Sequence, residues 1–305
     1  MAVSKSFVIW AERYLQNQHF GKHQECNTRC LIDKVTRFED EHKHPMNIDS
    51  MTADDLRVFA DFLSSDYDIS MNTIVTNMTL MRTVCNWVRK QGVTNNGPFF
   101  GYDMPKALYG TPYFLTIQER DQVLDADLTD DAELAEYRDM FVFQCMVGCR
   151  HSDLVTFTPK NIIDGVLEYI PIKTKGKLGD VVRVPLIPKA MAILDGHDHG
   201  DDEPIFPKHY NFKFNDAIRR ILKRAKVNRV VTVINPKTRL EEKKPISDVA
   251  TSHLARRTFI GNLYRMVKDP DLVASMSGHA KGSVAFARYR VIDDDMKKSL
   301  VELIQ

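Results

Sequence analysis

The sequence predicts a mainly helical protein of the α+β class, with two domains and a small antiparallel sheet in the second. Apolar residues recur with a helical period through the first ninety positions. A stretch rich in asparagine, glycine and proline follows at 93–112. Further along, apolar and polar residues alternate on both sides of a glycine-containing turn, which is typical of a β-hairpin. The 305 residues suffice for two hydrophobic cores.

Four helices are expected in the first domain, where they would pack as a small bundle. Their apolar stripes fall at 6–16, 27–42, 50–66 and 71–92. In the third of these segments the apolar stripe begins at Leu56, and Thr52 precedes it with acidic residues between them, so Thr52 is expected to cap that helix. Gly92 is expected to end the fourth helix, because glycine readily takes a left-handed conformation. The first domain is therefore predicted at 1–92, with a linker at 93–112.

The second domain is predicted at 113–305. Its expected elements, in order, are a helix with a capping box at Thr116 and Glu119, a long apolar helix ending at Gly148, a β-hairpin at 165–187 and several further helices. The last segment, 291–305, is amphipathic and is expected to be a tail that packs on another surface.

The composition is that of a soluble globular protein, with 43% hydrophobic and 27% charged residues. No apolar run approaches the roughly 20 residues of a membrane-spanning helix. Glu12 and Arg13 interrupt the apolar start, so the chain does not begin with the apolar core of a signal peptide. These features predict a cytoplasmic protein with no membrane partner.

The five cysteines include two pairs at a spacing of four, Cys26 with Cys30 and Cys145 with Cys149. Two such pairs are able to form a zinc site, but the same spacing also suits thiols on the buried face of a helix. An odd number of cysteines argues against a disulfide framework. We therefore expect buried thiols and no metal.

The net charge of +1 conceals an uneven distribution. Residues 208–257 hold 14 lysines and arginines against four acids, whereas 123–139 hold seven acids and one arginine. A local excess of positive charge is enough to attract a polyanion, although a solvated charged face is the alternative. The candidate DNA-contacting residues in the basic block are Arg219, Arg220, Lys223, Arg224 and Arg257.

Several polar residues interrupt apolar patterns and together suit phosphate chemistry. They are Arg150, the turn lysines Lys173, Lys175 and Lys177, the pair His253 and Arg256, and finally His279 and Tyr289. Arginine binds phosphate oxygens through its planar fork, and histidine donates to a developing oxyanion. Lysine can protonate a leaving oxygen, and tyrosine can carry a phosphoryl group covalently. The sequence contains no HExxH pattern for a metal.

This order of residues resembles the tyrosine recombinases, or phage-type integrases, along nearly the whole chain. The segment MVGCRHSDLVTF is similar to the first family box, with Arg150 as its arginine and Asp153 as its supporting acid. SHLARRTF is similar to the second box, with His253 and Arg256, and GHAKGSVAFARYR to the last, with His279 and Tyr289. The interval from His279 to Tyr289 is one residue longer than usual. Lys175 is the expected family lysine, with Lys173 and Lys177 as alternatives.

The resemblance implies a SAM-like core-binding domain at 1–92 and a tyrosine-recombinase catalytic domain at 113–305. It implies cleavage of DNA by Tyr289 through a 3′-phosphotyrosine, with no metal, nucleotide or other cofactor. The implied partners are double-stranded DNA and three further copies of the chain. A homotetramer on two DNA sites would exchange strands through a Holliday junction, and the free protein would be a monomer or weak oligomer.

In this family the C-terminal tail docks on a neighbouring protomer, and DNA-bending accessory factors often take part. The segments ARRTF and ARYRVIDDDMKK resemble those of integrases of Bacteroides-type mobile elements. This resemblance implies a bacterial, nucleoid-associated protein. Two alternatives stay open at this point. One is a DNA-binding relative that has lost catalysis, and the other is a breaker and rejoiner such as a type IB topoisomerase or a hairpin telomere resolvase.

Overall fold

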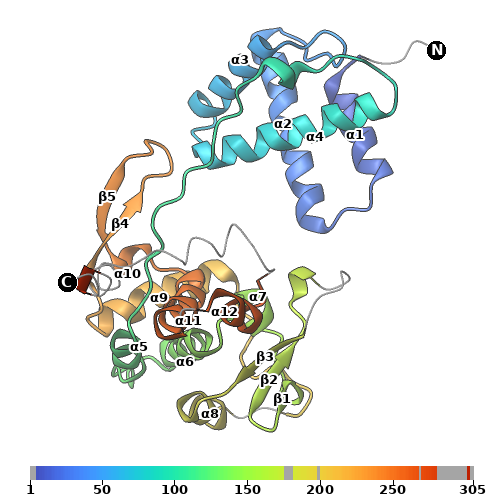
Figure 1. The fold of residues 1–305 in the computed structure, drawn as a ribbon. Coiled ribbons are helices and arrows are strands. Elements are labelled where there is room, and N and C mark those ends of the chain that lie inside the picture. Colours follow the sequence, from blue (N-terminus) through green and yellow to red (C-terminus); the bar gives the residue numbers. More distant parts are fainter. Residues whose placement is uncertain (1–4, 175–180, 198–199, 268, 280–300, 303–305) are drawn as a thin grey trace. The chain divides into compact units, whose positions relative to one another are not determined.

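The computed structural model describes residues 5–174, 181–197, 200–267, 269–279 and 301–302 (Figure 1). Helices dominate it and small antiparallel sheets accompany them, which confirms the predicted fold class. The chain divides into two compact units, Met1–Tyr109 with Ile234–Glu241, and Gly110–Val233 with Glu242–Gln305. Among the described helices, none has the length and apolar character needed to cross a membrane.

The described part of the first unit is built on four helices, as predicted. They are α1 (Phe7–Asn17), α2 (Lys22–His42), α3 (Ala53–Ser65) and α4 (Met71–Lys90), followed by the short η1 (Pro98–Gly101). Their apolar stripes meet in one core, in which Phe7, Leu31 and Leu56 are fully buried. The expected cap of α3 is present, because the Thr52 hydroxyl accepts from the Asp55 N–H and the Asp55 carboxylate accepts from the Thr52 N–H.

The prediction of buried thiols is right for three cysteines and wrong for two. Cys85, Cys145 and Cys149 are buried, and burial raises the pKa of Cys85 to about 12. Cys26 and Cys30 are exposed on α2. The buried stripe of α2 comprises Thr28, Leu31, Ile32, Val35 and Phe38. At 100° per residue, positions 26 and 30 lie on the opposite face of the helix.

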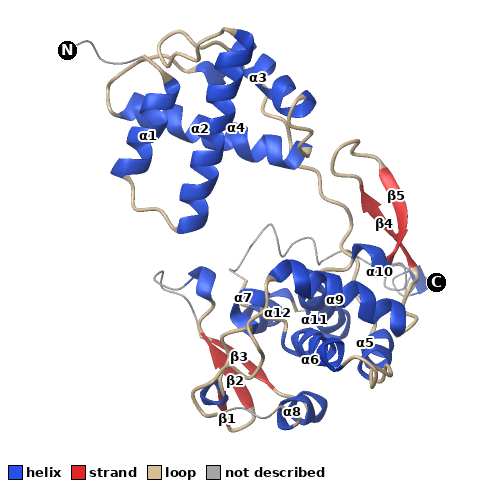
Figure 2. Ribbon diagram, turned by 180° about the vertical axis from the view of Figure 1, so that it is seen from behind, coloured by secondary structure: helices blue, strands red, loops and turns tan. Residues whose placement is uncertain are grey.

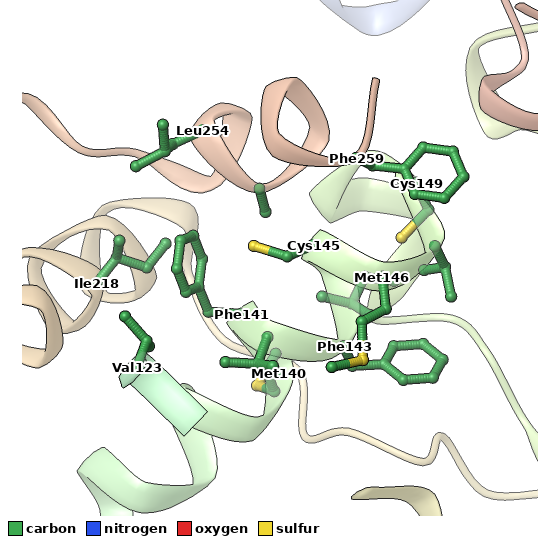
Figure 3. Close-up of a cluster of buried hydrophobic side chains, with 14 of the residues drawn as sticks. Val123, Met140, Phe141, Phe143, Cys145, Met146, Cys149, Ile218, Leu254 and Phe259 are labelled. Atoms are coloured by element: carbon green, nitrogen blue, oxygen red, sulfur yellow. The ribbon is translucent and has the colours of Figure 1, made fainter. Parts of the chain in front are cut away.

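The second unit is organised around α6. The helices named for its described residues are α5 (Ile117–Leu124), α6 (Ala132–Val147), α7 (His151–Leu154), α8 (Pro188–Asp195), α9 (Asn211–Arg224), α10 (Ile246–Val249), α11 (Ser252–Val267) and α12 (Pro270–Ser277), with η2 (Pro159–Asn161) and η3 (Ile172–Thr174) between them. Every residue of α6 from Met140 to Val147 is buried. Figure 3 shows side chains of α5, α9 and α11 packed around this helix. A helical segment that is buried on all sides is enclosed by its neighbours, and this is the case for the second half of α6.

One sheet of the second unit contains the predicted hairpin. It has the order β1 (Ile162–Ile163), β2 (Val166–Tyr169) and β3 (Val182–Pro185), all antiparallel. Tyr169 pairs with Val182, which confirms the hairpin, while β1 was not predicted. Figure 2 shows this sheet to one side of the helices. A second pair of strands, β4 (Val230–Ile234) and β5 (Glu241–Pro245), was also not predicted.

Candidate active site

The turn after α6 places Arg150 against α11. Gly148 ends α6 in the left-handed conformation, with φ of 68°, and Arg150, in an extended conformation, is the residue directly before α7. A Cβ atom on Gly148 would lie 2.2 Å from Cδ1 of Phe259, so α11 passes too close for any side chain at position 148. This close approach brings Arg150 next to the helix that bears His253 and Arg256.

Arg256 is the largest of the fully buried side chains in the described structure, with 1% of its surface exposed. Its Nη1 donates to the Gly148 carbonyl oxygen at 2.7 Å. Its Nη2 lies 3.0 Å from Nδ1 and 3.2 Å from Nε2 of His279. Because burial of an unsatisfied charge is costly, these bonds hold the guanidinium in one position. Arg256 thereby joins the α6–α7 turn to the end of α12.

His279 lies directly after α12 and the left-handed Gly278. A Cβ atom on Gly278 would lie 3.0 Å from Cγ2 of Val182 and 3.1 Å from Cγ of Pro171, so this turn packs closely on the sheet. The pKa of His279 is lowered to about 3. Burial is the main cause, followed by the positive charges of Arg256, Arg150, His253 and Lys173. The ring is therefore neutral at pH 7 and belongs to a strongly positive site.

The lysine-bearing segment is tied to the Arg150 turn by Asp153. Oδ1 of Asp153 accepts a hydrogen bond from the Ile172 N–H at 2.9 Å, and Ile172 begins η3. Asp153 is 1% exposed, and the described contacts give its Oδ2 no hydrogen-bond partner. Lys173, the second residue of η3, is exposed. Asp153, the expected supporting acid, therefore holds the backbone of the segment that carries Lys173 through this hydrogen bond.

The structure brings together five of the candidate residues from distant parts of the sequence. They are Arg150, Lys173, His253, Arg256 and His279, the first four of which lie near enough to His279 to lower its pKa. His253 lies on the exposed side of α11. The remaining candidates, Lys175, Lys177 and Tyr289, lie outside the described residues, as does most of the tail at 291–305. Their places in the site stay predictions.

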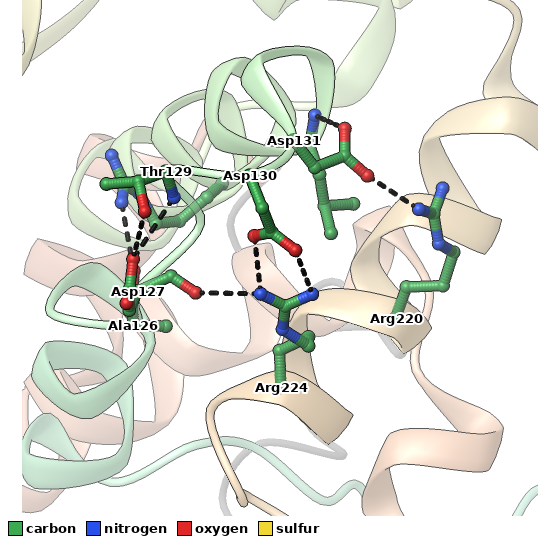
Figure 4. Close-up of polar contacts among 9 residues, drawn as sticks. Ala126, Asp127, Thr129, Asp130, Asp131, Arg220 and Arg224 are labelled. Carbon is green, nitrogen blue, oxygen red and sulfur yellow. Dashed lines mark hydrogen bonds and ion pairs between the residues drawn. The ribbon is translucent and has the colours of Figure 1, made fainter.

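Four basic residues of α9 form ion pairs within the second unit, two of which Figure 4 shows. Arg224 donates from both terminal nitrogens to Asp130, at 2.6 and 3.0 Å, and Arg220 donates to Asp131 at 2.8 Å. The other two pairs are Arg219 with Asp216 at 3.3 Å and Lys223 with Asp248 at 2.8 Å. The acidic stretch thus neutralises much of the charge on α9. Contact of these four residues with DNA stays a prediction.

Arg257 has an aromatic neighbour. Its guanidinium carbon lies 5.1 Å from the ring centroid of Tyr113, a cation–π distance. The hydroxyl of Tyr113 donates to the Val249 carbonyl at 2.9 Å, and burial raises the pKa of this tyrosine. Arg257 is half-buried here, so a DNA contact by this residue also stays a prediction.

Sequence reasoning missed Ser277, which contacts His279. Its Oγ lies 2.9 Å from Nδ1 of the histidine and is fully buried with the rest of the residue. A serine two residues before a histidine is common in any sequence and gives no signal of this contact.

The comparisons with known proteins agree with this arrangement. The model of the phage integrase family matches residues 113–296. Among curated proteins, none matches the chain in sequence. The Tn1549 transposon integrase in complex with a circular intermediate DNA is 15% identical, with a TM-score of 0.74 over 98% of this chain and 99% of that one.

A lambda integrase dimer bound to a COC′ core site is 14% identical, with a TM-score of 0.68 over 94% of this chain and 95% of that one. A lambda integrase tetramer bound to a Holliday junction is 15% identical, with a TM-score of 0.65 over 94% and 76% of the two chains. At these identities the similarity concerns the fold. The family model covers more than half of the sequence, and the chain therefore belongs to the phage integrase family of tyrosine recombinases.

Proposed function

We propose that this protein is a site-specific DNA recombinase that cuts and rejoins DNA through a covalent bond to Tyr289. The observation that carries the proposal is the meeting of Arg150, Arg256 and His279 with His253 and Lys173 in one positive site. Four separate segments supply these residues. Fixed donors of this kind stabilise the charge that develops on a phosphate in the transition state.

The proposed reaction exchanges one phosphodiester bond for another. The oxygen of Tyr289 attacks the phosphorus and gives its proton to His253 or His279, and the bond from phosphorus to the 5′-oxygen breaks. Arg150 and Arg256 would bind the non-bridging oxygens, and Lys175, or Lys173 in the alternative assignment, would give the leaving 5′-oxygen its proton. The 3′-phosphotyrosine keeps the bond energy, so a second 5′-hydroxyl can attack it without ATP. The guanidinium groups supply the charge stabilisation, and the reaction as proposed requires no metal.

We propose double-stranded DNA as the substrate, with four copies of the chain on two DNA sites. The similar integrases are in complex with DNA, and one is a tetramer on a Holliday junction, which supports this assembly by analogy of fold. The free protein would be a monomer or weak oligomer, and accessory DNA-bending factors would assist it. Since chromosomal DNA is the proposed substrate, we place the protein in the bacterial cytoplasm.

We also propose that the unit at 1–92 binds one face of the duplex and the unit at 113–305 the other, with 93–112 as the connection. The tail at 291–305 would dock on a neighbouring copy during strand exchange. These roles follow the family resemblance, and the helical bundle of the first unit is compatible with them.

A nicked suicide duplex tests the proposal. Its sequence would come from DNA that flanks the gene, and cleavage would release a short fragment and trap the covalent adduct. The expected result is a DNA-shifted protein band that survives SDS and forms in the presence of EDTA. Tyr289→Phe should bind the duplex without forming the band, whereas Tyr264→Phe, in α11 and outside the last box, should retain it.

Other outcomes point to other functions. Tight binding by the wild type with no adduct would indicate a DNA-binding relative without catalysis. Relaxation of supercoiled plasmid without site preference would indicate a topoisomerase. An undiminished adduct in Tyr289→Phe would remove that residue from its role.

A further inference from the structure

Two asparagines of α9 contact the first residue of α11. Oδ1 of Asn215 accepts a hydrogen bond from the backbone N–H of Ser252 at 2.8 Å. Oδ1 of Asn211 accepts one from the hydroxyl of Ser252 at 3.2 Å. Ser252 is 8% exposed, and α11 begins at this residue. Residues four positions apart lie on one face of a helix, so this face of α9 holds both the backbone and the side chain of Ser252.

The bond to the Ser252 backbone satisfies a donor that the start of a helix leaves open. The first N–H groups of a helix have no acceptor within it, because no earlier turn supplies one. Asparagine often provides the acceptor from the position directly before a helix. Here it comes from Asn215, which lies 37 positions away in the sequence and on another helix. Because a backbone N–H only donates, the atom of Asn215 that it meets is the amide oxygen.

α9 is a firm support for this contact. Figures 1 and 2 both show α9 beside α11. The apolar face of α9 includes Phe214, Ile218 and Ile221, which are fully buried in the core of the second unit. Asn215 directly follows Phe214. The packing of α9 therefore determines where the asparagine oxygen lies, and this oxygen determines where α11 begins.

His253, the second residue of α11, depends most on this support. Its side chain is exposed, so burial in the core does not determine its position. Arg256, three residues later, has anchors of its own at the Gly148 carbonyl and at His279. The start of α11 and its first turn are thus held by separate contacts. Loss of the bond to Asn215 should displace His253 and leave Arg256 in place.

We propose that Asn215 is a positioning residue, which sets the place of His253 in the candidate active site by accepting from the Ser252 N–H. Asn211 adds a second, longer contact to the same residue. The consequence for cleavage rests on the proposed function, in which His253 is one of the groups around the phosphate. A shift of its imidazole would slow cleavage, because catalysis depends strongly on where the reacting and supporting groups lie.

Hydrogen exchange in the full chain without DNA tests the bond itself. The Ser252 amide should exchange at least about tenfold more slowly in the wild type than in Asn215→Leu, which removes the acceptor and keeps a branched side chain. Leucine suits a helix better than asparagine, so α9 should stay folded. Asn215→Asp keeps an oxygen at this place and should keep the protection. Equally fast exchange of the Ser252 amide in the wild type and Asn215→Leu would overturn the proposal.

The imidazole signals of His253 and His279 test the effect on position. In ¹³C-labelled protein without DNA, His253→Gln and His279→Gln identify the two signals. Asn215→Leu should shift the signal of His253 and leave that of His279 in place. Gln122→Leu is the matched control, because this amide bonds to the Ala225 carbonyl at the other end of α9, at 2.7 Å, and it should move neither signal. An unmoved His253 signal, or equal shifts of both, would contradict a specific action on His253.

A double-mutant cycle in the suicide-duplex assay tests the role in the reaction. Asn215→Leu should slow single-turnover cleavage by about tenfold and change DNA affinity by less than about twofold. In a His253→Ala background the same substitution should change the rate by less than about twofold, because the group that it displaces is already absent. Asn215→Asp should keep the wild-type rate, as should Gln122→Leu. Equal slowing in both backgrounds would indicate a general structural role and overturn the proposal.

The measurements with and without DNA separate this inference from the proposed function. A wild type that never forms an adduct, but whose His253 signal depends on Asn215, would contradict the proposed function and leave the placement of His253 intact. A wild type that cleaves DNA, but whose Ser252 amide and His253 signal are unaffected by Asn215→Leu, would contradict this inference alone. The His253 signal decides the placement even where His253→Ala cleaves too slowly for the cycle.

Discussion

The carbonyl oxygen of Gly148 accepts a hydrogen bond from Nη1 of Arg256 at 2.7 Å, although 108 positions separate the two residues. The same glycine lies against Phe259 of α11, where a Cβ atom would come within 2.2 Å of the ring. The turn that ends α6 therefore supplies both an acceptor for the buried guanidinium and the space for α11. The position of Arg150, two residues later, depends on this turn.

Gly148→Ala should lower the free energy of unfolding by about 3 kcal/mol, because it adds a steric clash to the cost of a left-handed residue. Gly165→Ala is the control, since Gly165 has a φ of 74° but nothing within 4 Å of its added Cβ. It should lose only about 1 kcal/mol, the cost of the conformation. Urea unfolding measures both, and equal losses would show that the contact with Phe259 is unimportant.

Asp153→Ala should slow single-turnover cleavage of the suicide duplex by about tenfold, because the Ile172 N–H loses its acceptor and η3 loses its attachment. DNA affinity should change by less than about twofold, since the buried carboxylate does not face the duplex in this proposal. Asp202→Ala is a suitable control, because Asp202 is an exposed partner of Lys160. A normal cleavage rate in Asp153→Ala would remove Asp153 from the support of the site.

The stability of the protein should depend on the protonation of His279. The unfolded chain binds this proton near pH 6.5, whereas the folded chain binds it only near pH 3. The stabilising contribution of the neutral ring is thus fully present above pH 6.5 and is lost as the pH falls toward 3. The electrostatic effects of Arg256, Arg150, His253 and Lys173 also oppose protonation of the ring.

Urea unfolding of the wild type and His279→Gln between pH 7.5 and 4.5 measures this effect. The stability of the wild type relative to the variant should fall as the pH falls. The pKa of His151 is also lowered, mainly by burial, but this residue is present in both proteins and its effect cancels. A constant difference between the wild type and His279→Gln would contradict the lowered pKa.

Binding of DNA by α9 would require its arginines to exchange carboxylates for phosphates. Asp130→Asn should therefore strengthen binding to DNA and steepen its salt dependence by up to about 0.9, because Arg224 becomes available as a cation. Asp202→Asn is the control. It also removes one negative charge from the second unit, but the residue that it releases is Lys160, which is not part of α9. Equal effects of the two substitutions would indicate that α9 does not face the DNA.

The sequence predicted the local structure well where one segment determines it. The capping residues Thr52 and Thr116 lie where their side chains and spacing predict, and the apolar stripe of α9 is buried as its period predicts. The second pair of strands was missed because β5 has the sequence EEKKP, which has no alternation and no buried residue. The strand conformation of β5 depends on its pairing with β4 across the turn.

The sequence did not predict which distant segments contact one another. The spacing of the basic residues in α9 indicated a charged face. It did not show that Arg224 pairs with Asp130, which is 94 positions away in the sequence and whose carboxylate oxygen lies 2.6 Å from the guanidinium. The motifs identified Arg256 and His279 as candidates without showing that they bond to each other. The contact between Ser277 and His279 also depends on the turn at Gly278, which only the three-dimensional structure shows.

The identity of the residue that bonds covalently to DNA tests the central claim most directly. The adduct trapped on the suicide duplex would be digested with trypsin and nuclease, and mass spectrometry would locate the remaining nucleotide phosphate. The account predicts the modification on Tyr289, joined to the 3′ end of the cleaved strand and formed without added metal. A nucleotide on another residue, such as Tyr264 or Tyr210, or a bond to the 5′ end, would contradict it.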